Sequence, residues 1–156
     1  MQNQAKLFFP KALWKNMIQE LKKRGDGEGE SGAFLLGPME ENRIESFVCF
    51  DDLDPRAIAS GIIVFRSKYY ADLWNLCRER NLRVWADIHT HPGKWTSQSK
   101  LDETHPLISQ RGHIALIVPN YAQNQNQLLG GVGIYEYQGD YKWITLTTKK
   151  GIIKWI

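Results

Sequence analysis

The sequence has few cysteines, no long apolar run and no long block of charge of one sign. Its two cysteines, Cys49 and Cys77, lie in apolar stretches and belong to no CxxC or Cys/His pairing. A disulfide scaffold and a zinc finger are thereby excluded, and both cysteines are predicted to be core residues. No window reaches the roughly 18 apolar residues of a membrane span, and Met1 to Phe9 lacks a signal-peptide pattern. We therefore expect a cytoplasmic protein with no membrane partner.

The charge balance does not indicate a nucleic-acid partner. The chain has 20 Lys and Arg against 17 Asp and Glu, a formal net charge of +3, and its densest basic runs are Lys22 to Arg24 and Lys149-Lys150. Its six tryptophans are scattered and do not alternate with basic residues. Nucleic-acid binding needs a basic and aromatic stripe, which this sequence lacks. With 42% hydrophobic and 24% charged residues over 156 positions, the composition predicts one folded domain.

Apolar periodicity predicts a mixed α/β domain. Helices are expected from Pro10 to about Gly25 and from Lys68 to Arg80, where apolar residues recur at helical spacing. Residues 61–65 are expected to form a strand or a buried approach to one. The other predicted strands are 33–36, 43–50, 84–88, 113–119, 131–137, 142–147 and 152–156, with loops at 25–32, 51–55 and 123–127. No repeat or interdomain linker interrupts this order, so residues 1–156 are predicted to form a single domain around one sheet.

The histidines suggest a metal site. His89-Thr90-His91-Pro92 directly follows an alternating strand, and residues i and i+2 of a strand point to the same face about 7 Å apart. Asp102 lies eleven residues after His91 and completes a Ser99-x-x-Asp pattern. Two imidazole nitrogens and one carboxylate would leave the fourth position of a zinc ion open, which is typical of catalytic zinc.

Each half of this pattern has another interpretation. His-x-His also fits a surface strand or hydrogen-bonded histidines, and Ser99-x-x-Asp102 is equally a helix capping box. The two readings of Ser99 are compatible, because a cap would hold Asp102 in place. Amidohydrolase sites also begin with His-x-His, but they belong to barrels of about 250 residues, so this chain is too short for one.

Taken together, these motifs resemble the signature of the JAMM, or MPN-plus, metallopeptidases. That signature is a distant glutamate, then His-Ser/Thr-His-Pro and, after a short loop, Ser-x-x-Asp. Here the family's Glu-x-x-Gly/Ala-x-Leu-x-Gly is matched by Glu30-Ser-Gly-Ala33-Phe-Leu35-Leu-Gly37. The likeness covers most of the chain and is greatest to compact bacterial Jab-type peptidases, although Gln98 stands where many eukaryotic relatives have proline. It implies a mixed-sheet MPN (Jab) domain with a cytidine-deaminase-like arrangement and flanking helices.

The resemblance also implies a role for each motif residue. His89, His91 and Asp102 would bind Zn²⁺, and Glu30 would hold the reacting water and act as general acid and base. Ser99 would donate a hydrogen bond to the oxyanion that develops on the attacked carbonyl.

Other residues near the motif compete for these roles. Glu28 is the rival of Glu30, but only Glu30 lies seven residues before Gly37 and abuts the predicted strand. Asp87 could orient a histidine ligand, although an ordinary strand carboxylate is the favoured interpretation. The histidines outside the motif, which we do not assign to the metal, are His105 and His113.

The activity implied by the resemblance is that of a zinc-dependent metalloprotease. It would hydrolyse the isopeptide or peptide bond after the C-terminal glycine of ubiquitin or a ubiquitin-like protein, in deconjugation or precursor maturation. Bacterial antiphage pathways with ubiquitin-activating-like and conjugating-like enzymes are the expected setting. The alternatives are a Jab-type hydrolase acting on a sulfur-carrier protein or short peptide, and a non-enzymatic binding scaffold. The intact set of five motif residues argues against the scaffold, because binding alone would not need them all.

Overall fold

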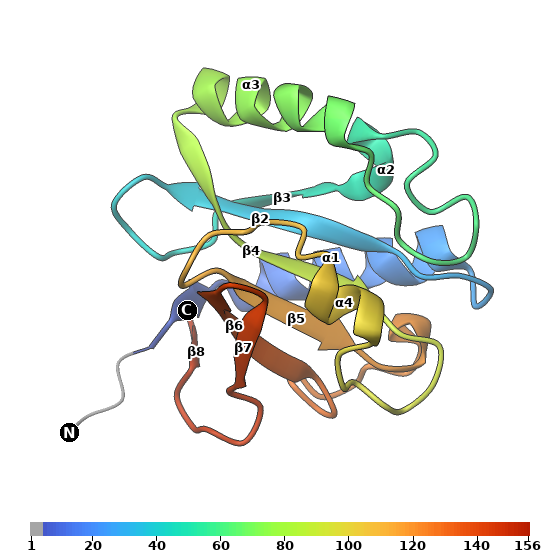
Figure 1. The fold of residues 1–156 in the computed structure, drawn as a ribbon. Coiled ribbons are helices and arrows are strands. Elements are labelled where there is room, and N and C mark those ends of the chain that lie inside the picture. Colours follow the sequence, from blue (N-terminus) through green and yellow to red (C-terminus); the bar gives the residue numbers. More distant parts are fainter. Residues whose placement is uncertain (1–4) are drawn as a thin grey trace.

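A computed structural model of the chain describes residues 5–156 (Figure 1). Residues 1–4, which the sequence assigns to the same domain, lie outside this part. No helix of the described chain is long and apolar enough to cross a membrane. The elements are β1 (Leu7–Phe9), α1 (Lys11–Gly25), β2 (Gly32–Pro38), β3 (Ser46–Cys49), α2 (Phe50–Leu53), η1 (Ser67–Tyr69), α3 (Tyr70–Arg80), β4 (Leu82–Thr90), α4 (Lys100–Thr104), β5 (Ile114–Val118), η2 (Asn120–Ala122), β6 (Gly133–Gly139), β7 (Lys142–Thr145) and β8 (Ile153–Trp155).

Six strands form the main sheet in the order β3-β2-β4-β5-β6-β7. Only β4 and β5 run parallel, and every other neighbouring pair is antiparallel. The mixed sheet predicted from the sequence is therefore confirmed. A separate parallel pair joins β1 to β8, so the two ends of the described chain lie together. The sequence analysis missed β1, because three residues are too few to show a period.

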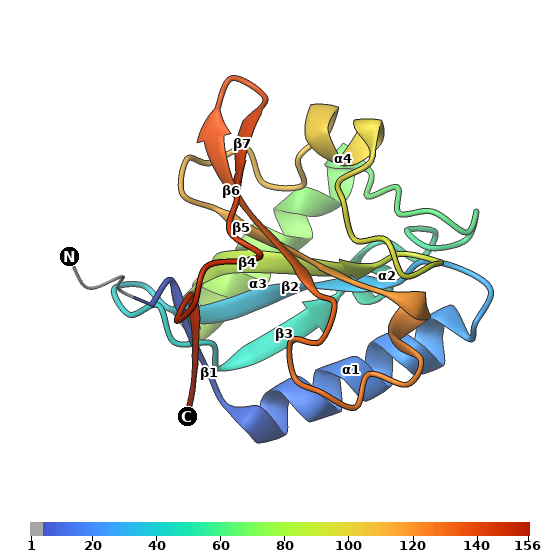
Figure 2. The ribbon, with the colours of Figure 1, turned by 90° about the horizontal axis from the view of Figure 1, so that it is seen from below.

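The two long helices cover opposite faces of the sheet (Figures 1 and 2). Successive residues of β2 alternate between the faces, since Ala33 and Leu35 pack with α1 while Phe34 and Leu36 pack with α3. Both cysteines are buried and free, as predicted. The α1 residues in the core recur at helical spacing: Trp14, Met17, Ile18 and Leu21.

Between β3 and α3, one sequence expectation is wrong and one that was left open is decided. Phe50 was expected to end a strand, and 51–55 to be a loop, but Phe50 begins the short helix α2. Segment 61–65, expected to be a strand or a buried approach to one, has no strand partner among the described residues and is the buried approach. Its apolar alternation is real, because Ile63 and Phe65 pack against the core while Ile62 and Val64 are about half exposed. The alternation of apolar burial in 62–65 therefore arises because an extended segment is buried on one side, and it does not require that the segment pair within the sheet.

Asp54 stabilises this irregular region. Its side chain is fully buried and accepts hydrogen bonds from the backbone amides of Arg56 and Arg66, both at 3.0 Å. The Arg66 guanidinium adds contacts from Nη2 at 2.5 Å and from Nε at 3.1 Å. These hydrogen bonds, those from the Arg66 side chain above all, hold the pKa of Asp54 well below its usual range. The carboxylate thus closes the loop 54–66, which contains the extended segment 61–65.

The low pKa of Asp54 predicts a specific pH dependence of stability. A carboxyl with a lowered pKa stabilises the fold above its unfolded-state pKa of about 4, and this contribution is lost as pH falls further. Urea unfolding should find Asp54→Asn less stable than wild type by a margin that is constant between about pH 5 and 8 and shrinks below about pH 4. A margin that does not change with pH would contradict the ionic role of Asp54.

Candidate metal centre

The antiparallel pairing of β2 with β4 places the start of one strand beside the end of the other. Gly32, the first residue of β2, is directly opposite His89 near the end of β4. A Cβ on Gly32 would lie 2.4 Å from the carbonyl oxygen of Ile88 and 3.0 Å from Cβ of His89. Only glycine fits in this position, because a real side-chain carbon never approaches so closely. Glu30 lies two residues before Gly32 and is therefore near the histidines.

A buried polar contact extends this pairing beyond the strand. The amide of Thr90 donates to the carbonyl of Ser31 at 2.9 Å, and the amide of Ser31 donates to Oγ1 of Thr90 at 3.1 Å. The Ser31 hydroxyl donates to the carbonyl of Leu21 in α1 at 2.6 Å. Both Ser31 and Thr90 are fully buried. Ser31, immediately before β2, is thus joined to β4 and to α1, directly beside Glu30.

His89, His91 and Asp102 converge on one point. The Nε2 atoms of His89 and His91 lie 3.1 Å apart. The carboxylate of Asp102 lies beside both, with Oδ2 3.1 Å from Nε2 of His91 and Oδ1 3.4 Å from Nε2 of His89. Ligands bound tetrahedrally to zinc at about 2.0–2.1 Å are separated by roughly 3.3 Å. The observed separations match this value, so the three side chains can hold a metal ion.

The outer nitrogens of the two histidines are in different environments. Nδ1 of His91 lies 3.2 Å from the carbonyl oxygen of Trp95, to which it can donate, leaving Nε2 unprotonated for a metal. Nδ1 of His89 is buried and has no partner among the described residues. Such an unpaired group costs about 1–3 kcal/mol. Nε2 of His89 faces the cluster and is free to bind a metal, so the residues fit an ion by their spacing and by their donor atoms, two imidazole nitrogens and a carboxylate.

Asp102 is held by a complete capping box at the start of α4. Its amide donates to Oγ of Ser99 at 3.0 Å, and its Oδ2 accepts from the Ser99 amide at 2.9 Å. Burial would raise the pKa of Asp102, but hydrogen bonds from His89 and His91 hold it well below the usual range. Because Oγ of Ser99 accepts in the cap, its own hydrogen remains available to donate elsewhere.

The structure separates the two candidate glutamates. Glu30 is half-buried, and burial raises its pKa while the nearby His89 and His91 and an amide hydrogen bond from Ile63 oppose the rise. Glu28 lies in the exposed turn after α1, where its amide donates to the carbonyl of Gly25. Only Glu30 is electrostatically coupled to the histidine pair.

The loop between His91 and Ser99 is anchored to β6. The hydroxyl of Thr96 donates to the carbonyl of Gly131 at 2.8 Å, and the hydroxyl of Tyr135 donates to the carbonyl of Thr96 at 2.6 Å. A Cβ on Gly133 would lie 2.5 Å from that same carbonyl oxygen. The loop therefore packs directly on the β6 backbone.

A left-handed turn after β5 fixes the other end of the loop. Asn120, Tyr121 and Ala122 all have positive φ, between 53° and 63°, which is uncommon for residues other than glycine. The amide of Tyr121 donates to the carbonyl of His91 at 2.8 Å, and that of Asn120 to Gly93 at 2.9 Å. The sequence analysis missed this turn, since its only local signal is the tolerance of Asn120 for the left-handed region.

A cavity of about 400 Å³ adjoins the cluster and includes His89 and Asp102 in its wall. Its other lining residues come from the extended segment 63–65, from α3 and α4, from the segment after α4 and from the β6–β7 turn. Most of them are apolar or aromatic, as in cavities that bind organic ligands. They are Ile63, Val64, Phe65, Tyr70, Leu101, Thr104, His105, Pro106, Leu107, Ser109 and Tyr141.

Asp87, His105 and His113 lie outside the cluster. Oδ2 of Asp87 is 2.6 Å from Nε2 of the buried His113, and Asp87 makes no hydrogen bond to His89 or His91 among the described residues. His105 is exposed and lines the adjoining cavity.

Comparison with known proteins identifies the fold. No family model matches the sequence. The structure is similar to that of a protein from Desulfitobacterium hafniense (TM-score 0.64, 12% identity, 96% of this chain and 92% of that chain covered). It is also similar to a protein from Salinibacter ruber (TM-score 0.58, 15% identity, 95% and 91% covered) and to a JAB1/MPN domain protein from Archaeoglobus fulgidus (TM-score 0.53, 13% identity, 96% and 99% covered). The chain therefore has the Jab1/MPN fold predicted from its motifs.

The cluster predicts a zinc stoichiometry that substitution should change. Elemental analysis of the purified protein should find about one zinc per chain, and His89→Ala or Asp102→Ala should remove it because each supplies one of three ligand atoms. His105→Ala is the control, since this histidine is outside the cluster and should leave zinc unchanged. Retention of zinc in His89→Ala would rule out the ligand assignment.

The packing of the loop on β6 predicts an indirect effect on metal binding. Gly133→Ala should push the Thr96 carbonyl away and displace the Asp102 cap, weakening zinc affinity by about tenfold or more in competition with a chelating dye. Gly93→Ala is the matched control, because a Cβ there would meet nothing within 4 Å. Equal affinities of the two variants would show that the Thr96 contact does not position the site.

Proposed function

We propose that the chain is a zinc-dependent metallopeptidase that cleaves the isopeptide or peptide bond after the C-terminal glycine of ubiquitin or a ubiquitin-like protein. The observation that carries the proposal is the convergence of two imidazole nitrogens and one carboxylate at tetrahedral spacing, with Glu30 beside them. The preference for a C-terminal glycine, the antiphage pathway and partnership with activating-like and conjugating-like enzymes rest on the family resemblance.

The motif residues divide the chemistry among them. His89, His91 and Asp102 would hold the zinc, which when bound lowers the pKa of water toward about 7 and polarises the scissile carbonyl. The Glu30 carboxylate takes the proton of the attacking water and returns it to the leaving amine. The Ser99 hydroxyl donates to the carbonyl oxygen as that atom gains negative charge.

The extended segment beside the cavity suits an extended substrate tail. Val64 donates its amide to the carbonyl of Ala57, while no backbone partner is present for the amides of Ile63 and Phe65 in the described chain. Val64 is about half exposed. A peptide can pair with such a segment as an added strand, which provides affinity through the main chain. A protein with a free tail is therefore a better substrate than a folded loop.

Two alternatives remain distinct from this proposal. A sulfur-carrier protein or short peptide would use the same zinc and the same glutamate, and would differ only in what docks beside the tail. A binding scaffold would need neither Glu30 nor the metal. The two alternatives therefore make different predictions for the same glutamate variant.

Substitution of Glu30 tests the hydrolytic mechanism. Glu30→Gln should lower the cleavage rate of ubiquitin-like fusions by about 100-fold or more while retaining zinc, because an amide cannot take the proton. Glu28→Gln, two residues away and exposed, should cleave at the wild-type rate. Mass spectrometry of parallel reactions with a sulfur-carrier fusion distinguishes the substrates. Full activity of Glu30→Gln would refute the mechanism, and no cleavage of any fusion by zinc-loaded wild type would favour the scaffold.

A further inference from the structure

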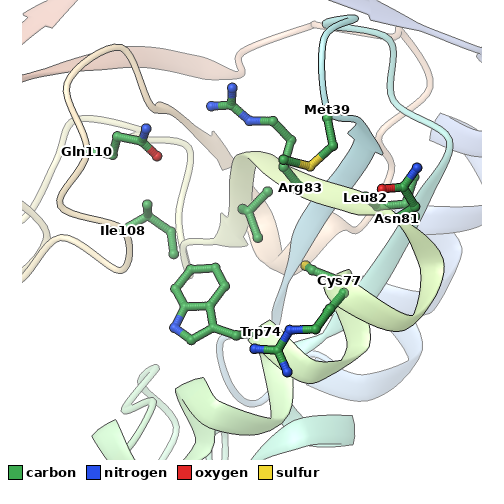
Figure 3. Close-up of a pocket in the computed structure, with 10 residues that line it drawn as sticks. Met39, Trp74, Cys77, Asn81, Leu82, Arg83, Ile108 and Gln110 are labelled. Carbon is green, nitrogen blue, oxygen red and sulfur yellow. The ribbon is translucent and has the colours of Figure 1, made fainter.

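A second cavity lies at the opposite end of β4 from the histidine cluster. It has a volume of about 370 Å³ and is formed between α3, the start of β4 and the segment after α4 (Figure 3). We call it the Trp74 groove, lined by Met39, Trp74, Cys77, Arg78, Asn81, Leu82, Arg83, Val84, Ile108 and Gln110. Leu82 and His89 are seven residues apart on one strand, which places the groove roughly 23 Å from the cluster.

The floor and rim of the Trp74 groove are apolar. Cys77, Val84 and Ile108 are buried at its base, and burial raises the pKa of the Cys77 thiol, which keeps it neutral. Trp74 and Met39 stand at the rim, 44% and 52% exposed. Large apolar side chains exposed at a concave surface are typical of sites that receive an apolar group.

The charged residues of the groove are all basic. Arg78 and Arg83 line it, and no carboxylate does. Neither arginine forms an ion pair with any residue between 5 and 156, whereas Arg24, Arg43 and Arg66 all do. Arg83 is held over the ring of Trp85 at 3.9 Å, and Nη1 of Arg78 donates to the amide oxygen of Asn75. Two oriented guanidinium groups beside an apolar floor are thus available to an anionic partner.

The groove is separate from the cavity at the metal centre, and one segment forms the wall between them. Leu107 and Ser109 line the metal-side cavity, while Ile108 and Gln110 line the Trp74 groove. On α3, Tyr70 and Trp74 divide in the same way and stack on each other with centroids 6.1 Å apart. A ligand in the groove therefore does not occupy the proposed catalytic site.

We propose that the Trp74 groove is a docking site for a short acidic peptide segment that inserts one apolar side chain between carboxylates. The apolar side chain rests on the floor beside Trp74, and the flanking carboxylates pair with Arg78 and Arg83. The volume suits one large side chain and the backbone around it, which is too little for a folded element. Such a segment belongs to a partner protein that docks apart from the metal-side cavity.

Fluorescence anisotropy with defined peptides tests this site without any catalytic activity. The probe is a labelled panel in which Leu, Phe, Ile, Met or Trp lies between pairs of Asp and Glu. At least one member should bind, weaken with rising salt, and lose most of its affinity when the acids become Asn and Gln or the apolar residue becomes Ser. Arg78→Glu and Trp74→Ser should each weaken binding by about fivefold or more, because each removes one of the two kinds of contact.

Arg56→Glu is the matched control. It makes the same charge change at an exposed arginine outside the groove, and should leave the affinity within about twofold of wild type. Three results would overturn the proposal: no panel peptide binds, Arg56→Glu weakens binding as much as Arg78→Glu, or a Lys- and Arg-flanked panel binds equally well. Sedimentation that shows a dimer lost in Trp74→Ser would assign the groove to a second copy of the chain instead.

Discussion

Antiparallel strands bring the first residue of one strand beside the last residue of its neighbour, and the metal centre depends on this geometry. Glu30 and the His89–His91 pair are some sixty positions apart in sequence, yet the pairing of β2 with β4 places them at one edge of the sheet. The reciprocal hydrogen bonds of Ser31 and Thr90 continue the pairing beyond the strand and tie it to α1. Without this buried contact, the glutamate would be carried by a flexible glycine-rich turn.

Local patterns in the sequence predicted the parts of the site that local forces determine. The two-residue period of β4 places His89 and the next residue but one, His91, on the same side, and the Ser-x-x-Asp pattern forms the capping box because both hydrogen bonds lie within four residues. The approach of Asp102 to His91 is not local, since it depends on how the intervening loop folds against β6. That approach was expected only from the joint occurrence of the motifs and their resemblance to a family.

The features that the sequence left open or missed have a common physical origin. Periodicity reports which side chains are buried, but it does not report which backbone groups are paired. Ile63 and Phe65 are partly buried in an extended segment that no strand joins, so they have the pattern of a strand without its hydrogen bonds. In the left-handed turn Asn120 to Ala122 the important groups are in the backbone, since the amides of Asn120 and Tyr121 donate to the carbonyls of Gly93 and His91. No side-chain pattern marks these hydrogen bonds in the sequence.

The two cluster histidines reach the same point by different means. His91 is oriented by a hydrogen bond from its outer nitrogen to the Trp95 carbonyl, whereas His89 has no such acceptor because the nearest strand carboxylate, Asp87, is paired with His113. His89 is instead buried within the sheet, opposite Gly32, where a Cβ would lie 3.0 Å from that of His89. A rigid strand can replace a hydrogen bond in fixing a ligand, since packing restricts the side chain as strictly as a polar partner does. His91 lies just beyond the end of β4 and is not held by the strand, so its orientation depends on the hydrogen bond to the Trp95 carbonyl.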